Sequence, residues 1–218
     1  MKAQARRLTM LDLERGTREL AARDARLGRV VRRLGVPPMW GRRPGFATLV
    51  HIILEQQVSI AAARTMFRRL EAHLGGIDPQ RVAAAGVDGL RAFGLTRQKS
   101  AYCHGLALRI RDGRLDLTAA ARAEDESGRR TLLEVPGLGP WSVDIYYLMA
   151  LRRPDVWPTG DLALATALRD LGRMNRLPTA EEQQRLARRW APWRSVAARM
   201  LWAHYLEARG RYSPDQGT

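Results

Sequence analysis

Hydrophobic residues recur at helical spacing along the whole chain, and no segment shows the strict alternation expected of a half-buried strand. Between residues 9 and 34, apolar and charged side chains alternate in a way that predicts one or two amphipathic helices. The apolar positions of this region are Leu11, Leu20, Leu27, Val30, Val31 and Leu34. The pattern therefore predicts an all-α protein.

The segment 45–55 is apolar on nearly every side, which is typical of a helix in the centre of a domain. The pattern then breaks at Glu55-Gln56-Gln57-Val58-Ser59, where Ser59 is well placed to cap a new helix from Ile60 to about Leu74. The two glutamines lie at this junction. They form either an ordinary polar loop or a corner that presents a side chain to a partner.

Further helices are expected along the rest of the chain. Two short ones, 79–85 and 89–93, precede a helix 97–112 that Thr96 caps, and another helix begins near Leu117. A polar stretch, 123–129, leads into helical turns at 130–135. The remaining predicted helices are 141–151, 162–171, 180–190 and 192–209, and the tail Tyr212 to Thr218 is expected to fray.

A glycine-rich turn separates two of these helices. Gly137 and Gly139 flank Leu138, and Pro136 and Pro140 close the turn, so the chain must reverse direction within a few residues. Glycines let a flat anionic surface approach the backbone, and N–H groups at the start of the next helix can bind phosphate oxygens. The sequence therefore predicts a helix-hairpin-helix that could clamp a DNA backbone.

The charge of the chain supports a polyanionic partner. Its formal net charge is +15, and only two of the 37 basic residues, Lys2 and Lys99, are lysines. This charge favours nucleic acid as a partner, although an Arg-rich genome would produce part of the same composition. Lys99 is expected on a helix surface or against a phosphate.

Other features exclude several classes of protein. One cysteine, Cys103, excludes an internal disulfide and a four-cysteine zinc or iron–sulfur site, and the four histidines are dispersed. No apolar run is long enough to span a bilayer, and the N-terminus lacks the features of a signal peptide. We expect a monomer of the cytoplasm, associated with the nucleoid and not with a membrane.

Asp161 precedes an apolar helix, so on its position alone it is a good helix N-cap. A basic chain, a phosphate-ready hairpin and a downstream carboxylate nevertheless form a suggestive combination. The segment VPGLGPWSVDIYYLMALRRPDVWPTGDLAL resembles the helix-hairpin-helix-Gly/Pro-Asp signature of base-excision DNA glycosylases, and is most similar to the 3-methyladenine DNA glycosylase II branch. The resemblance runs from about Phe46 through ILEQQVSIAAA and GLTRQKSAYCHGLA to WAPWRSVAARMLWAHYL.

This resemblance implies one glycosylase domain, 1–218, made of two helical lobes with an active-site cleft between them. One lobe, about 45–160, carries the wedge loop and the hairpin, and helices 9–36 and 161–210 form the other. The N-terminal β-domain of some members has no counterpart here. Double-stranded DNA with a damaged base is the implied partner.

The resemblance also implies roles for individual residues. Asp161 matches the essential aspartate, and Gln57 matches the wedge that fills the gap left by a flipped nucleotide. Trp202 matches an aromatic residue of the base pocket, to which Ile145 and Tyr146 belong; Ile145 stands where a bacterial relative has an aromatic side chain. The residues that match DNA-backbone contacts are Gly137, Gly139, Trp141 and Ser142. The carbonyls of Leu133, Val135 and Leu138 match a hairpin site for a monovalent or divalent cation, and no other cofactor is required.

The chemistry agrees with these roles. Cleavage of an N-glycosidic bond passes through an oxocarbenium-like sugar, which an ionised Asp161 would stabilise. A cationic alkylated base leaves without protonation, so one carboxylate suffices. Trp202 could stack on such a base, although simple core packing would also explain it. Bifunctional relatives carry a nucleophilic lysine where this chain has Trp141.

The sequence thus predicts a monofunctional glycosylase, without lyase activity, that removes 3-methyladenine and 7-methylguanine types of base from duplex DNA. Two alternatives stay open. The same mechanism could act on etheno or deaminated bases, because the shape of the pocket sets the choice of lesion. The chain could also be a non-catalytic DNA-binding module that uses the hairpin alone.

Overall fold

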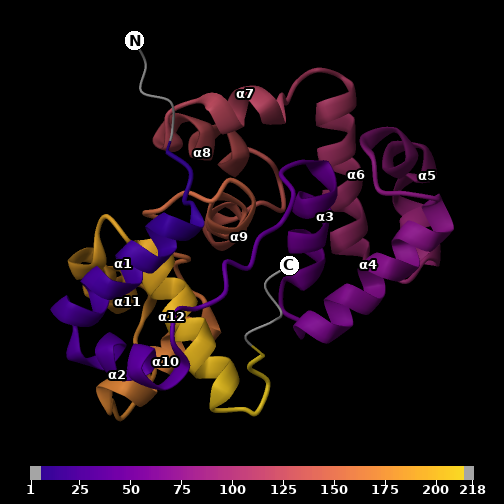
Figure 1. Cartoon of the computed structure of the whole chain (residues 1–218). Helices are drawn as coiled ribbons and strands as arrows, with labels where there is room; N and C mark the ends of the chain where they lie inside the picture. Colours follow the sequence, from indigo (N-terminus) through magenta and orange to yellow (C-terminus); the bar gives the residue numbers. More distant parts are fainter. Residues whose placement is uncertain (1–5, 214–218) are drawn as a thin grey trace. The chain divides into compact units, whose positions relative to one another are not determined.

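A computed structural model describes residues 6–213, and most of the tail that was expected to fray, 214–218, lies outside this range. The described residues form helices and no strand, which confirms the all-α prediction (Figure 1). None of these helices is long and apolar enough to cross a membrane.

The chain divides into two compact units. Unit 1 comprises Arg43–Tyr146. Unit 2 comprises Arg6–Arg42 and the described residues from Tyr147 onward. The segment 147–160, which the sequence assigned to the hairpin lobe, therefore belongs to unit 2. The physical reason is that the backbone carbonyl of Met149 accepts the N–H of Arg42, which holds this segment in the second unit.

Unit 1 is built around a central helix. Its elements are α3 (Phe46–Glu55), α4 (Ile60–Leu74), α5 (Pro79–Ala92), α6 (Arg97–Arg111), α7 (Leu117–Arg122), α8 (Asp125–Leu133) and α9 (Pro140–Ile145). Helix α3 contacts α4, α6 and α9 (Figure 1), and its apolar side chains are almost all buried. Segment 45–55 is thus the core helix that its hydrophobicity predicts.

The helix starts of unit 1 follow from their caps. The hydroxyls of Ser59 and Thr96 accept N–H groups of the following turn, at 3.2 Å in both cases, so both predicted caps are confirmed. The expected pair of short helices, 79–85 and 89–93, is present: α5 consists of two helical segments separated by a kink at Gly86, where φ is 63° and the backbone is not helical. The prediction for 123–129 is wrong: α8 begins at Asp125, because two acidic residues in its first turn interact favourably with the helix dipole.

Unit 2 combines both ends of the chain. Its elements are α1 (Met10–Arg23), α2 (Ala25–Leu34), the π-helix Tyr146–Ala150, α10 (Leu162–Gly172), α11 (Ala180–Ala187), the 3-10 helix Arg188–Trp190 and α12 (Arg194–Glu207). Helix α12 contacts α1, α2 and α10 and is buried along most of its length. The helix expected at 141–151 is therefore α-helical only to Ile145 and continues as a π-helix that starts at the unit boundary.

One predicted core residue of α1 is wrongly placed. Leu11 is 78% exposed, whereas Leu13 and Leu20 are fully buried. Each residue turns the helix by about 100°, so Leu11 lies about 200° from Leu13 and faces away from the core. Helix α1 starts with a capping box, in which Thr9 and Asp12 each bond the other's backbone N–H.

A buried arginine joins separate segments of unit 2. The Arg199 guanidinium donates to the carbonyls of Met39 (2.7 Å), Leu148 (3.1 Å) and Ser195 (3.1 Å), and to that of Trp40 (3.4 Å). Burial lowers the pKa of Arg199 to about 9. Its side chain thereby fixes the segment before unit 1, the π-helix and α12 in one arrangement.

Candidate functional site

The predicted hairpin is a tight turn between α8 and α9. Its N–H groups close successive short rings: Val135 donates to the carbonyl of Leu132 at 3.1 Å, and Leu138 donates to that of Val135 at 3.0 Å. Gly137 has a φ of 92°, a conformation that side chains with a Cβ rarely adopt. The turn thus requires glycine at 137 for its backbone alone.

The two glycines of the turn have different surroundings. A Cβ at Gly137 would lie only 2.4 Å from Cγ of Tyr102 on α6, so the hairpin packs directly against that ring. A Cβ at Gly139 would meet no atom within 4 Å, and its φ of −77° is ordinary. Gly137 is therefore needed inside the unit, whereas Gly139 leaves the backbone open to a ligand.

Two further contacts hold the hairpin in place. Arg129 of α8 forms an ion pair with Asp144 of α9, and Asp144 is buried. The Gln56 side-chain amide donates to the carbonyl of Gly137 at 2.8 Å and to the Ser142 hydroxyl at 2.9 Å. The Ser142 side chain is therefore engaged inside unit 1, which leaves only its backbone for the predicted contact with DNA.

The predicted wedge loop is fixed at both ends. Gln56 ties it to the hairpin, and Ser59 caps α4 beyond it. Between them Gln57 is exposed and has a φ of 58°, a left-handed conformation that costs free energy for a residue with a Cβ. A strained, exposed side chain between two anchored ends suits a residue that must project from the surface.

Lys99 supports the same loop from inside. Its ammonium group donates to the carbonyl of Leu54, in the last turn of α3, at 2.7 Å, and the residue is 8% exposed. Burial lowers the pKa of Lys99. The expectation that Lys99 lies on a helix surface or against a phosphate is therefore wrong, because α3 ends beside α6 and needs a donor for its last carbonyls.

The two predicted pocket residues of unit 1 are buried. Ile145 is 4% exposed and Tyr146 is 2% exposed. The Tyr146 hydroxyl oxygen accepts the N–H of Gly45 at 3.0 Å, and burial raises its pKa. Both residues lie where α9 passes into the π-helix, and irregular helical turns of this kind often occur at functional sites.

In unit 2, Asp161 and Trp202 lie together. Asp161 is the N-cap of α10, and its Oδ1 accepts the N–H of Leu164 at 2.9 Å. The same oxygen accepts the indole N–H of Trp202, on α12, at 3.2 Å. The capping role expected from position is thus real, and it holds the carboxylate against an aromatic side chain that is 8% exposed.

Among residues 6–213, no group of three or more His, Cys, Asp or Glu side chains is arranged to hold a metal ion. Cys103 is buried, and burial raises the pKa of its thiol to about 12, which suppresses thiolate chemistry. The predicted cation ligands are backbone carbonyls instead. That of Val135 already accepts one N–H, and carbonyl oxygen is a suitable ligand for a hard cation.

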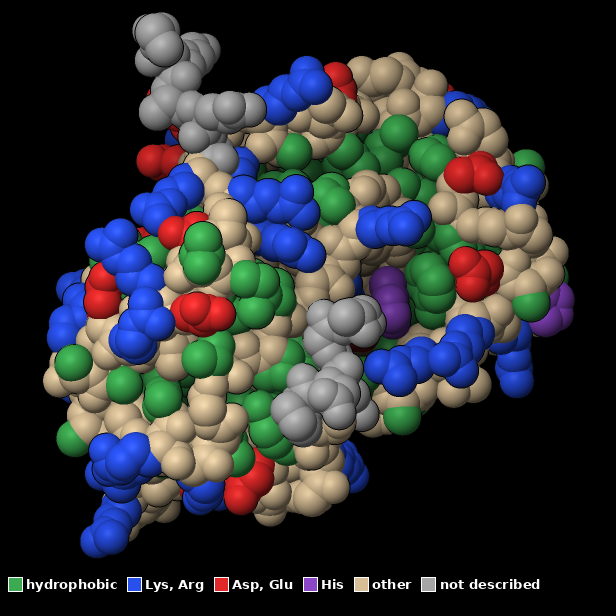
Figure 2. All heavy atoms as spheres, in the orientation of Figure 1, with side chains coloured by type: hydrophobic (Ala, Val, Ile, Leu, Met, Phe, Trp, Pro, Cys, Tyr) green, Lys and Arg blue, Asp and Glu red, His purple; other side chains and the backbone are tan. Residues whose placement is uncertain are grey.

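Reasoning from the sequence missed Gln56 and the pair Arg129 and Asp144. Gln56 had a weak signal, since it was one of two glutamines at the junction and only Gln57 was assigned a role. The ion pair had none, because its partners lie on different helices and meet only when the hairpin closes. Lys and Arg side chains are spread over the visible face of both units in Figure 2, so charge alone does not mark a site.

Comparisons with known proteins agree with this geometry. The HhH-GPD superfamily, described as base excision DNA repair proteins, matches residues 50–192. A DNA-3-methyladenine glycosylase of Bacillus subtilis is 26% identical over 184 residues, which are 79% of this chain and 59% of that protein. The chain thus spans less than two thirds of the length of that relative.

Solved structures show the same architecture. A DNA-3-methyladenine glycosidase from Bacillus halodurans is 28% identical, with a TM-score of 0.73 over 90% of this chain and 92% of that one. A 3-methyladenine DNA glycosylase of Schizosaccharomyces pombe, in complex with abasic DNA, is 24% identical, with a TM-score of 0.75 over 86% of this chain and 95% of that one. At 24% identity, the similarity to the S. pombe structure shows a shared fold and nothing more.

Proposed function

Because this chain belongs to the HhH-GPD superfamily of base excision DNA repair proteins, we propose that it is a DNA glycosylase that removes alkylated purines from duplex DNA. The substrate class rests on the names of relatives such as the B. subtilis protein. The observation that carries the catalytic assignment is the bond between Trp202 and Asp161, which places an aromatic ring beside a fixed carboxylate.

The steps of the reaction assign work to this chain's own residues. A base inside a duplex must be extruded before it can be reached, at a cost of a few kcal/mol. Gln57 would fill the vacated stack. Because the residues on both sides of it are already held in place, the loop would lose little further conformational entropy. Trp202 would stack on the extruded base, which contributes about 1–3 kcal/mol per base at such aromatic platforms. Cationic alkylated purines gain most, because they add a cation–π attraction.

Asp161 would then stabilise the positive charge that develops on the sugar as the N-glycosidic bond breaks. The cap bond and the indole bond hold Oδ1 in position beforehand, so little reorganisation is needed during the reaction. Water completes the hydrolysis, and an already cationic base departs with the bonding electrons without being protonated.

Substitution of Asp161 by Asn tests this role. Asn caps a helix as well as Asp does, so α10 should keep its start while the negative charge is lost. Release of 3-methyladenine from alkylated DNA should fall by about 10² or more, with duplex binding largely kept. Asp116→Asn is the matched control, because Asp116 is likewise the N-cap of its helix, α7, and it should leave base release unchanged.

The outcomes separate the competing functions. Unchanged base release by Asp161→Asn would remove Asp161 from the mechanism. Binding without release of any base from a panel of duplexes, each with one defined lesion, would favour a DNA-binding module. Release of etheno or deaminated bases in preference to alkylated purines would keep the mechanism and change the substrate.

The chain is proposed to lack lyase activity. Trp141 stands where bifunctional relatives carry a nucleophilic lysine, and Lys99 is buried with its ammonium group bonded to Leu54. Borohydride should therefore trap no covalent adduct with abasic DNA. A trapped adduct that persists in Lys99→Met would point to the remaining amine groups, and one that disappears would assign the nucleophile to Lys99.

The hairpin is proposed to bind a cation through the carbonyls of Leu133, Val135 and Leu138. A cation there would neutralise the carbonyl dipoles and strengthen attraction for phosphate beside Gly139. Duplex affinity should then differ between sodium, potassium and magnesium at equal ionic strength. Affinities that depend on ionic strength alone would argue against the site.

A further inference from the structure

Helix α4 carries three arginines within six residues. Arg64, Arg68 and Arg69 are exposed, and none of them pairs with a carboxylate in the described part of the chain. Some exposed arginines elsewhere in the described chain do form ion pairs with acidic side chains, as in the pairs Arg15–Glu19, Arg130–Glu126 and Arg176–Glu182. The charge of α4 therefore remains available to an external anion.

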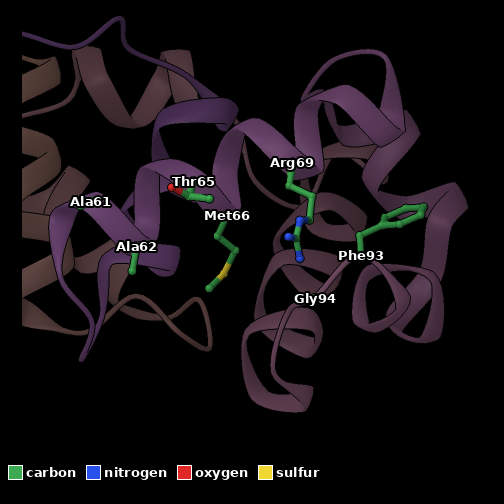
Figure 3. A pocket seen from close by; sticks show the side chains of 7 residues that line it. All are labelled: Ala61, Ala62, Thr65, Met66, Arg69, Phe93 and Gly94. Atoms are coloured by element: carbon green, nitrogen blue, oxygen red, sulfur yellow. The ribbon is translucent and has the colours of Figure 1, made fainter.

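The α4 face also contains a shallow hollow (Figure 3). Its lining residues are Ala61, Ala62, Thr65, Met66 and Arg69 of α4, with Phe93 and Gly94 from the turn after α5. Small side chains line the end nearest the start of α4, and Arg69 and Phe93 lie at the other end (Figure 3). A small, partly apolar group with an attached anion would fit such a surface, and a deoxyribose phosphate is a group of this kind.

The position of α4 within unit 1 indicates which DNA strand it meets. Gln56, immediately before the wedge residue Gln57, is bonded to the hairpin, whereas α4 begins immediately after Ser59. Gln57 thus lies between a residue that is hydrogen-bonded to the hairpin, Gln56, and the first turn of α4. A side chain that enters a duplex stands between its two strands, so the surfaces that flank it face different strands.

We propose that the α4 face, defined as the exposed side of α4 that carries Arg64, Arg68 and Arg69 together with the hollow that Arg69 lines, binds the sugar-phosphate backbone of the undamaged strand opposite the lesion. This inference rests on the proposed function, in which the hairpin holds the damaged strand. Arg64 and Arg68 lie one turn apart, about 6 Å along the helix axis, and can reach different phosphates. Guanidinium groups bind phosphate oxygens in a bidentate manner.

Lys and Arg side chains lie over α4 in Figure 2, as they do over other parts of the visible face. Glu71 is the single acidic residue of this helix, and the hollow adds no carboxylate to the surface. A polyanion would therefore meet a nearly uniform positive field. The arrangement would also make affinity depend on a second strand, which lets the protein discriminate duplex from single-stranded DNA.

The test combines protein and DNA substitutions. The probe is a duplex with one tetrahydrofuran abasic analogue, prepared with neutral methylphosphonates near the site either in the damaged strand or in the opposite strand. Binding is measured for the native chain, for Arg64→Ala/Arg68→Ala and for the control Arg185→Ala/Arg188→Ala. The control removes the same charge from exposed arginines of unit 2. Thermal unfolding verifies that each variant is folded.

We expect Arg64→Ala/Arg68→Ala to lose about tenfold or more in duplex affinity, with the salt slope reduced by about 2, since each phosphate contact contributes about 0.9. Neutral linkages in the opposite strand should weaken the native chain and the control but cause no further loss in the α4 variant. Neutral linkages in the damaged strand should weaken all three proteins. Single-stranded affinity should not change.

Full sensitivity of the α4 variant to opposite-strand neutralisation would overturn the inference, as would insensitivity of the native chain to it. The inference would also be overturned if neutral linkages in the damaged strand, and not those in the opposite strand, caused no further loss of affinity in the α4 variant. Base release by the native chain is measured separately. If the native chain releases bases but the α4 arginines do not depend on the opposite-strand phosphates, only the α4 assignment is refuted. If they do depend on those phosphates but no base is released, only the glycosylase function is refuted.

Discussion

The two hairpin glycines should respond very differently to alanine. In Gly137→Ala, the new Cβ would lie 2.4 Å from Cγ and 2.7 Å from Cβ of Tyr102, on a ring held by a bond from Gln98. Overpacking of this kind costs about 1–3 kcal/mol. A φ of 92° adds about 1–2 kcal/mol for a residue with a Cβ. Alanine also lowers the conformational entropy of the unfolded chain, which offsets about 0.4–1 kcal/mol of this destabilisation.

The free energy of unfolding should therefore fall by about 1–5 kcal/mol in Gly137→Ala, compared with the 5–15 kcal/mol typical of a domain. Gly139→Ala has open space and an ordinary φ, so only the weaker N-cap preference of alanine applies, and the change should stay within about 1 kcal/mol. The same Cβ would stand where the phosphate is proposed to approach. Duplex affinity of Gly139→Ala should consequently fall about tenfold while its fold is kept.

Urea unfolding followed by circular dichroism measures the first quantity, and binding to an abasic duplex measures the second. Tyr102→Ala in the Gly137→Ala background removes the 2.4 Å contact and should recover part of the lost stability, so the two substitutions should not be additive. Equal stability losses in Gly137→Ala and Gly139→Ala would refute the reasoning, because only the contact with Tyr102 and the backbone conformation distinguish them.

Three further predictions concern other contacts. Burial alone would raise the pKa of Asp24, but hydrogen bonds from Arg26 and Trp190 hold it at about 2, so Asp24 should contribute about 2 kcal/mol of stability above pH 4 that is lost as pH falls toward 2. Urea unfolding at stepwise pH should show a flatter acid limb for Asp24→Asn, and an unchanged limb would contradict this. Gln56→Leu should reduce base flipping, reported by 2-aminopurine fluorescence beside the lesion, more than it reduces duplex binding; equal losses would make Gln56 a simple binding residue. Lys99→Met should lower the unfolding free energy by about 1–3 kcal/mol, because the Leu54 carbonyl loses its donor, with base release by the folded protein kept.

Local signals were sufficient for most of the helices. Ser59 and Thr96 marked helix starts because the cap is a contact between residues three apart, which periodicity and residue type specify together. The start of α8 was misplaced because its polar residues were read as a loop, although the acidic pair at its start is a helix signal. The spacing of apolar residues does not distinguish an α-helix from a π-helix, so the sequence does not predict the π-helix that begins at Tyr146.

The position of Asp161 before an apolar run predicts an N-cap, and the structure confirms that cap. Its bond to Trp202 joins residues on two helices that no local pattern connects, and its catalytic role stays a prediction from the resemblance. The prediction for Lys99 is wrong because its partner comes from tertiary packing and not from a local pattern. A charged side chain at the start of a helix is usually solvated, and only the packing of α6 against α3 gives its ammonium group a buried acceptor.

The order of the units along the chain has a consequence for synthesis on the ribosome. Within the described residues, unit 1 is the single segment Arg43–Tyr146, so the contacts that form its core become available once Tyr146 has emerged. Unit 2 needs both flanks, because Arg199 must reach back to the carbonyls of Met39 and Trp40. During translation, α1 and α2 therefore cannot complete their packing until α12 has been synthesised, whereas unit 1 can already fold. The bond between Asp161 and Trp202, both in unit 2, therefore forms only after α12 has emerged.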